Sequence, residues 1–168
     1  LSSQPEPQGR RVSVLTNAGG LGILCADACD AAGLELPELS EETRVALAAL
    51  LSPEASLANP VDMLGGATAK TYADAPRLLL PDPHVDAVIT LFVPTVTALA
   101  DDVARAIDDV AAAEAVGKPL LAVLMAGAGV PEALRTGESR VAAFAYPESA
   151  ARALGRGACA TAGSTPGS

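Results

Sequence analysis

Short apolar runs alternate along the chain with longer stretches in which apolar residues recur every three or four positions. The short runs at residues 11–16, 86–93, 119–125 and 141–145 predict β-strands, and residues 34–39 predict a further short strand. Pro37 favours an edge position for that strand, because proline cannot donate a hydrogen bond to a neighbouring strand. Strands that alternate with helices are typical of βαβ units and of a mainly parallel sheet.

The longer stretches predict helices at residues 20–32, 40–52, 67–80 and 97–116, and a last helix that starts at Pro147. Gly33 and Gly117 are expected to end the first and fourth of these helices. Pro76 predicts a kink or a break near Ala75 in the third. Thr95 or Thr97 is expected to cap the start of the fourth helix. One face of that helix is expected to carry Leu99, Val103, Ile107 and Val110.

This pattern predicts an α/β fold, namely a flavodoxin-like three-layer α/β/α domain with a five-stranded, mainly parallel sheet in the order 2-1-3-4-5. Ligands of such sheets bind beyond the carboxyl ends of the strands, which here carry residues 17–22, 94–97 and 127–129. Residues 11–156 would form the domain. The polar and proline-rich residues 1–10 are expected to be a linker, and the small, polar residues 157–168 a disordered tail.

Composition narrows the possible partners. The net charge of −9 repels nucleic acid, and the two Phe and two Tyr residues, with no Trp, offer few stacking faces for bases. No apolar run is long enough to span a bilayer, and no secretory leader opens the sequence, so we expect a cytoplasmic protein without membrane or nucleic-acid partners.

Residues that usually carry catalysis are sparse. Cys25 and Cys29 lie four apart on a predicted helix and could supply half of a metal site, but the single histidine favours two buried thiols instead. His84 follows a polar turn at the edge opposite the predicted site, which favours a surface histidine over a general base. The serine-hydrolase pattern GxSxG is missing. We therefore predict neither a catalytic residue nor a metal site in this chain.

Two segments are candidates for binding chemistry. In the run TNAGGLG, residues 16–22, a strand, a glycine turn and a helix start together present N–H groups to an anion, although a tight turn also needs glycine for steric reasons alone. The second segment is a turn-rich loop containing Asn59, Asp62, Gly65 and Gly66. Its amide and carboxylate support either the candidate site or an Asx-type turn at the surface.

The run RVSVLTNAGGLGILCADACDAAGLELPELSEET, followed by ASLANPVDMLGGATAKTYADAPRLLLPDPHVDAVITLFVP, resembles the ligase-CoA domain of ADP-forming acetyl-CoA synthetases. More distantly it is similar to the C-terminal domain of the succinyl-CoA synthetase β subunit. The resemblance extends over residues 10–156, and its motifs TNAGG-x-G, NPVD and DP-x-VDAV occur in the order and spacing of the family.

The resemblance implies a role within a larger, oligomeric acyl-CoA synthetase. Family enzymes interconvert acyl-CoA, nucleoside diphosphate and phosphate with a carboxylic acid, nucleoside triphosphate and CoA, through an acyl phosphate and a phosphorylated histidine. CoA, ATP or ADP and Mg²⁺ would be held by the CoA-binding, phosphohistidine and ATP-grasp domains of the parent enzyme. None would be bound by this domain alone, which would help to frame the phosphohistidine site and the interdomain interface.

By this resemblance Asn17, Ala18, Gly19 and Gly20 form the turn that faces phosphate and substrate. Pro94, Thr95 and Val96 match the turn that opens a helix directed at the phosphohistidine. The sequence departs from succinyl-CoA synthetase here, because that enzyme has a glycine-rich turn and Pro94 offers no N–H.

Two alternatives stay open. The domain could be a non-catalytic regulatory or assembly module of an acyl-CoA-synthetase-like protein lysine acetyltransferase. A free-standing flavodoxin-like binding domain is the weaker alternative, because flavin sites need aromatic stacking faces and this chain has few.

Overall fold

The computed structural model describes residues 4–113, 117–125, 127, 129–135 and 139–162. Its single sheet is parallel throughout, with the strand order β2-β1-β3-β4-β5. The strands are β1 (Val12–Thr16), β2 (Val61–Asp62), β3 (Ala87–Phe92), β4 (Leu120–Leu124) and β5 (Ala142–Phe144). The helices are α1 (Gly19–Ala31), α2 (Glu41–Leu50), α3 (Ala69–Leu79), α4 (Ala100–Ala113) and α5 (Pro147–Ala162), with a short 3₁₀ turn, η1 (Glu132–Leu134). The predicted fold class and strand order are confirmed.

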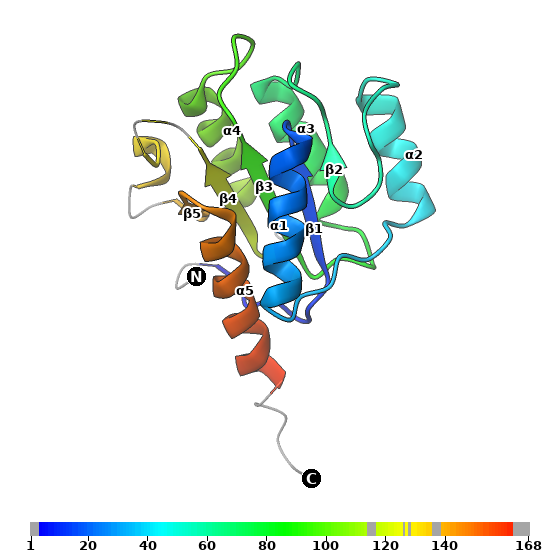
Figure 1. Ribbon diagram of the computed structural model, residues 1–168, viewed down its shortest axis with the longest axis vertical. Coiled ribbons are helices and arrows are strands. Elements are labelled where there is room, and N and C mark those ends of the chain that lie inside the picture. The colour runs from blue at the N-terminus through cyan, green and yellow to red at the C-terminus, as the bar shows by residue number, and fades with distance from the viewer. Residues whose placement is uncertain (1–3, 114–116, 126, 128, 136–138, 163–168) are drawn as a thin grey trace.

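Helices cover both faces of the sheet (Figure 1). On one face α1 packs beside α5, and on the other α3 lies between α2 and α4. Successive residues of β3 alternate between the two cores: Ile89 and Leu91 belong to the α1–α5 side, whereas Val88 and Phe92 belong to the α3–α4 side. All six residues of β3 are buried, as expected for the central strand of a parallel sheet.

The second strand is not where the sequence pattern predicts it. Within residues 34–39 only Glu35 forms a bridge, with Arg11, and the edge strand is instead the two-residue β2. The reason is the side chain of Asn59, which occupies the middle of the β1 edge. Its Oδ1 accepts from the Val14 N–H at 2.9 Å, and its Nδ2 donates to the Val12 carbonyl oxygen at 2.9 Å. A side-chain amide thus replaces a strand between Glu35 and β2.

The helix boundaries agree with most of the sequence signals. Ser40 caps α2 by accepting from the Thr43 N–H, and α5 begins at Pro147. Gly33 and Gly117 both have a φ of +70°, the left-handed conformation that glycine adopts without strain. The break predicted near Ala75 is wrong, because α3 continues through Pro76 to the buried Leu79.

The predicted disordered tail is wrong for residues 157–162, which form the last turns of α5. Ala158 is buried, and the Thr161 hydroxyl donates to the Pro7 carbonyl oxygen at 3.2 Å, so this end of the helix packs on the domain. Residues 163–168 lie outside the described part of the chain. Among the described helices, none has the length and hydrophobicity that a membrane span requires.

Candidate functional site

The two turns predicted to form the site lie on one edge of the sheet. β1 and β3 are parallel neighbours with Thr16 opposite Leu91, so the segments that follow them leave the sheet side by side. This edge, at the top of Figure 1, also receives the ends of β4 and β5. We call it the carboxyl rim.

Asn17 joins these two turns from the inside. Its Nδ2 donates to the Val93 carbonyl oxygen at 2.8 Å, and its Oδ1 accepts from the Val93 N–H at 2.9 Å. The residue is only 5% exposed. Both polar atoms of the amide therefore serve to hold the end of β3 against the end of β1, and neither is directed at solvent.

The glycine turn offers an open helix start beside Asn17. Ala18 is the N-cap of α1 but its side chain makes no capping bond, and within the described residues no acceptor is bonded to the N–H groups of Gly19 and Gly20. A Cβ atom at Gly20 would meet nothing within 4 Å. A Cβ at Gly19 would instead stand 2.8 Å from Oδ2 of Asp62. The first turn of α1 is thus open on the Gly20 side, while a carboxylate of the chain itself lies on the Gly19 side.

The turn after β3 differs from its prediction. α4 starts at Ala100, so neither Thr95 nor Thr97 is its N-cap. The two hydroxyls lie 2.9 Å apart, and the Thr97 hydroxyl donates to the Gly65 carbonyl oxygen at 3.2 Å. The Thr95 N–H bonds the Ala98 carbonyl oxygen, closing a separate turn before the helix begins. This turn also displaces Leu99 from the buried face of α4, and its side chain is 67% exposed.

The loop at residues 59–66 is divided between two places. Asn59 sits on the β1 edge, away from the rim, and the adjoining peptide bond to Pro60 is cis. Asp62 reaches the rim, where its Oδ1 accepts from the Leu64 N–H at 2.9 Å in an Asx-type turn. Gly65 touches the turn after β3 through its carbonyl group, and Gly66 is exposed. The loop thus supports the rim through Asp62 and Gly65.

Charged side chains gather at the opposite, amino edge of the sheet. Arg11 binds Asp86 through both Nη2 at 2.8 Å and Nε at 3.0 Å. Burial alone would raise the pKa of Asp86, but hydrogen bonds from Arg11 outweigh it and hold that pKa below its ordinary value. These contacts tie the start of β3 to the start of β1.

Asp82, which precedes β3 in the sequence, likewise joins separate segments of the chain at this edge. Its carboxylate accepts from the N–H groups of Ser40 at 2.9 Å and His84 at 2.7 Å. Burial would raise the pKa of Asp82, yet the hydrogen bonds from Thr43, His84 and Ser40 lower it. His84 itself is exposed and lies at this amino edge, as predicted, far from the carboxyl rim.

The cysteines of α1 are packing residues. Cys25 and Cys29 are fully buried against the sheet, on the shared face that their spacing predicts. The hydrogen bond with Cys29, together with burial, raises the pKa of the Cys25 thiol, which keeps it protonated and unreactive. The described residues include no group of three or more His, Cys, Asp or Glu side chains placed to hold a metal ion.

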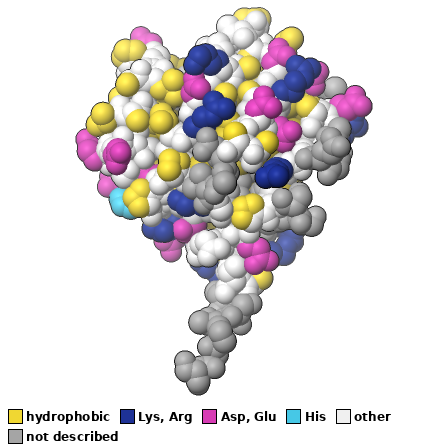
Figure 2. Space-filling view, turned by 180° about the vertical axis from the view of Figure 1, so that it is seen from behind, with side chains coloured by type: hydrophobic (Ala, Val, Ile, Leu, Met, Phe, Trp, Pro, Cys, Tyr) yellow, Lys and Arg dark blue, Asp and Glu magenta, His cyan; other side chains and the backbone are white. Residues whose placement is uncertain are grey.

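Exposed hydrophobic residues on the rim were not predicted from the sequence. Of seven large hydrophobic side chains exposed in the described chain, four lie in the segments directly after β3, β4 and β5, and two lie in the second turn of α1, the helix that follows β1. They are Ile23, Leu24, Val96, Leu99, Met125 and Tyr146. Hydrophobic side chains are visible at the top of the space-filling view, where the turn after β3 lies (Figure 2). A sequence signal did exist in Ile23 and Leu24, because they fall outside the helical spacing of the buried Leu21, Cys25 and Cys29.

Comparisons with known proteins agree with this arrangement. The sequence profile of the Ligase-CoA domain family matches residues 12–160. The chain is 43% identical over 131 residues to the ADP-forming acetate–CoA ligase II subunit alpha of Pyrococcus furiosus, covering 74% of this chain and 28% of that protein. It is 30% identical over 155 residues to the ADP-forming 4-hydroxybutyrate–CoA ligase of Nitrosopumilus maritimus, covering 92% of this chain and 22% of that protein.

A solved structure shows the same fold. The apo form of the dinucleotide forming acetyl-coenzyme A synthetase 1 from Ca. Korarchaeum cryptofilum superposes with a TM-score of 0.85 at 30% identity, over 99% of this chain and 38% of that one. The chain therefore spans between 22% and 38% of the length of these relatives. With most of its length matched by one family profile, and with the sheet order and rim that its motifs predict, this chain belongs to the Ligase-CoA domain family.

Proposed function

We propose that this chain is one domain of an ADP-forming acyl-CoA synthetase, and that its carboxyl rim docks against the domain carrying the phosphorylated histidine. The proposal rests on one observation: the carboxyl rim carries both exposed hydrophobic side chains and the open start of α1. Exposed hydrophobic side chains that gather at one part of a domain surface are typical of an interaction site. The names of the relatives supply the reaction, since they are ADP-forming acetate–CoA ligases.

Within that interface the domain would act by positioning and electrostatics. A helix N-terminus stabilises a nearby anion by about 0.3 to 1 kcal/mol. On α1 this potential is offered on the Gly20 side, because the carboxylate of Asp62 partly neutralises the Gly19 side. The turn at Pro94, Thr95 and Val96 would add apolar contact rather than N–H donors, since α4 begins only at Ala100 with Asp101 and Asp102 in its first turn.

The remaining chemistry would be supplied by other domains of the parent enzyme. CoA, ATP or ADP with Mg²⁺, and the histidine nucleophile would be held there, and the parent enzyme would be an oligomer. Phosphoryl transfer depends mainly on positioning and charge neutralisation. A domain that completes the walls of the site can therefore affect the rate without donating a catalytic group.

The proposal is tested in the full-length enzyme with the double variant Val96→Asp and Leu99→Asp. Both side chains are exposed, at 105% and 67%, so the fold of the domain should be unchanged. Two carboxylates placed in an apolar interface should reduce both histidine phosphorylation and acyl-CoA turnover at least tenfold. The matched control is Ala49→Asp on α2, which is exposed but lies away from the rim, and it should retain normal rates.

Unchanged phosphorylation and turnover in the double variant would refute the docking role. The regulatory alternative gives a different pattern: basal turnover would stay normal while assembly or acetyltransferase activity of the parent protein changed. Measuring the association state beside turnover separates the two functions.

A further inference from the structure

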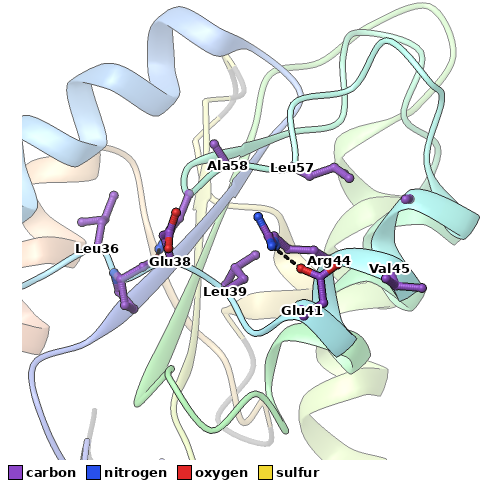
Figure 3. A pocket seen from close by; sticks show the side chains of 11 residues that line it. Leu36, Glu38, Leu39, Glu41, Arg44, Val45, Leu57 and Ala58 are labelled. Carbon is purple, nitrogen blue, oxygen red and sulfur yellow. Dashed lines mark hydrogen bonds and ion pairs between the residues drawn. The ribbon is translucent and has the colours of Figure 1, made fainter.

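A second surface lies at the opposite end of the sheet order from β5 and is independent of the proposed ligase role. A groove of about 510 Å³ runs between α2, residues 36–39 and residues 57–59. This volume is within the range of about 300 to 1,000 Å³ that is typical of ligand-binding clefts. Figure 3 shows Leu57 and Ala58 on one wall, with Leu39 and Glu38 opposite and Val45 at the α2 end.

One wall of the groove is held in place from behind. The Pro37 carbonyl oxygen accepts from Asn59 Nδ2 at 3.1 Å, and the Glu38 carbonyl oxygen accepts from His84 Nδ1 at 3.0 Å. Glu38, Leu57 and Ala58 line the groove, and their N–H groups make no hydrogen bond with any described residue. Fixed walls with free backbone donors are what an extended peptide requires, because its own N–H and C=O groups need partners along their length.

Charge selects the kind of peptide. The charged side chains lining the groove are the carboxylates of Glu38 and Glu41 and the guanidinium of Arg44. Arg44 is already paired with Glu41, as the dashed line in Figure 3 marks. Glu38 has no cationic partner among the described residues, so one negative charge is unbalanced among apolar lining residues that include Leu36, Leu39 and Val45.

We propose that this groove binds an extended segment of another polypeptide chain, apolar at alternate positions and with a lysine or arginine beside Glu38. Alternation directs every second side chain of such a segment toward the apolar lining of the groove. The described ends of this chain do not reach the groove, because Gln4 bonds the Leu120 carbonyl oxygen and Thr161 bonds Pro7 on the far side of the sheet (Figure 1).

The test uses the full-length protein and two fluorescein-labelled pentapeptides, one alternating valine with lysine and the other alternating valine with glutamate. Fluorescence polarisation should show that the lysine peptide binds at least tenfold more tightly. Glu38→Lys should reverse this preference, and the exposed Glu54→Lys, which makes the same charge change outside the groove, should preserve it. Ala58→Trp should fill the groove and abolish binding, whereas Ala49→Trp on the outer side of α2 should not.

Equal affinity for the two peptides, or an unaltered preference in Glu38→Lys, would overturn the proposal. So would binding that survives Ala58→Trp. Failure of the full-length protein to bind either peptide would also overturn it, because the groove would then be covered by the parent protein itself. None of these outcomes depends on acyl-CoA turnover, so they leave the docking role of the carboxyl rim unaffected.

Discussion

Replacing Asn17 with alanine should destabilise the domain substantially, although the residue sits in a glycine turn at the rim. The substitution removes two hydrogen bonds, of 2.8 and 2.9 Å, to the backbone of Val93. Each such bond contributes about 0.5 to 1.5 kcal/mol, and a buried group left without a partner costs about 1 to 3 kcal/mol. Since Val93 is only half-buried, water can partly replace the lost contacts. We expect a loss of about 2 to 3 kcal/mol.

Urea unfolding followed by far-ultraviolet circular dichroism measures this loss, because the chain has no Trp for fluorescence. Hydrogen exchange at the Val93 amide should accelerate in the variant. Val96→Ala is the control, since its side chain is fully exposed on the same rim and should change stability by less than about 0.5 kcal/mol.

Asn17→Asp provides a second check that depends on pH. The carboxylate still accepts from the Val93 N–H but faces the Val93 carbonyl oxygen without a proton to donate. This variant should therefore be less destabilised at pH 4 than at pH 7, relative to the native chain. The structural role of Asn17 would be refuted if Asn17→Ala lowered the free energy of unfolding by less than about 0.5 kcal/mol and left hydrogen exchange at the Val93 amide unchanged. The Asn17 side chain would then be available to bind a ligand.

Three further perturbations test the packing. Ser13→Ala should leave stability unchanged or raise it by up to about 1 kcal/mol in urea unfolding, because the buried Ser13 hydroxyl has no hydrogen-bond partner among the described residues. A loss above about 1 kcal/mol would contradict this. The pKa values of Asp82 and Asp86 are lowered on folding, so the free energy of unfolding should be constant above about pH 5 and fall as the pH drops through about 4. Asp82→Asn should make this fall with pH less steep. An equally steep fall in the variant would be evidence against a contribution of the Asp82 carboxylate to stability. Gly20→Ala should stabilise α1 by up to about 1 kcal/mol. Gly22→Ala should destabilise the domain, because a Cβ atom at residue 22 would stand 3.1 Å from Thr16 and 3.3 Å from Pro60. Equal melting temperatures of the two variants would refute this difference.

The sequence predicts those parts of the fold that depend on local pattern. The runs that became β1, β3, β4 and β5 are mostly apolar, and the starts of α2 and α5 follow from the single residues Ser40 and Pro147. The edge strand was wrong because its position depends on a contact between Asn59 and β1 across 45 residues, which no local pattern records. The start of α4 was wrong for a related reason, since a turn between Thr95 and Ala98 takes the place of the first helical residues.

The candidate site was predicted in location more than in detail. Parallel strands force the turns after β1 and β3 to the same edge, so their proximity follows from the fold class. The direction of the Asn17 side chain depends instead on the free backbone groups of Val93, which appear only once β3 is placed. The exposed hydrophobic side chains after β3, β4 and β5 give no such sequence signal, because their exposure is a property of the assembled fold, whereas the helical spacing of α1 already sets Ile23 and Leu24 apart from its buried face.

The composite edge of β1 also protects the domain against aggregation. An outer strand with unpaired N–H and C=O groups is a template on which another molecule can add its own strand. In this domain the outer side of β1 is covered along its length by Glu35, then by the amide of Asn59, and then by β2. On the far side of β2, Ser56 makes two hydrogen bonds to Asp62. Because the outer side of β1 itself is occupied in this way among the described residues, a second copy of the chain cannot easily pair a strand with β1, even though β2 has only two residues.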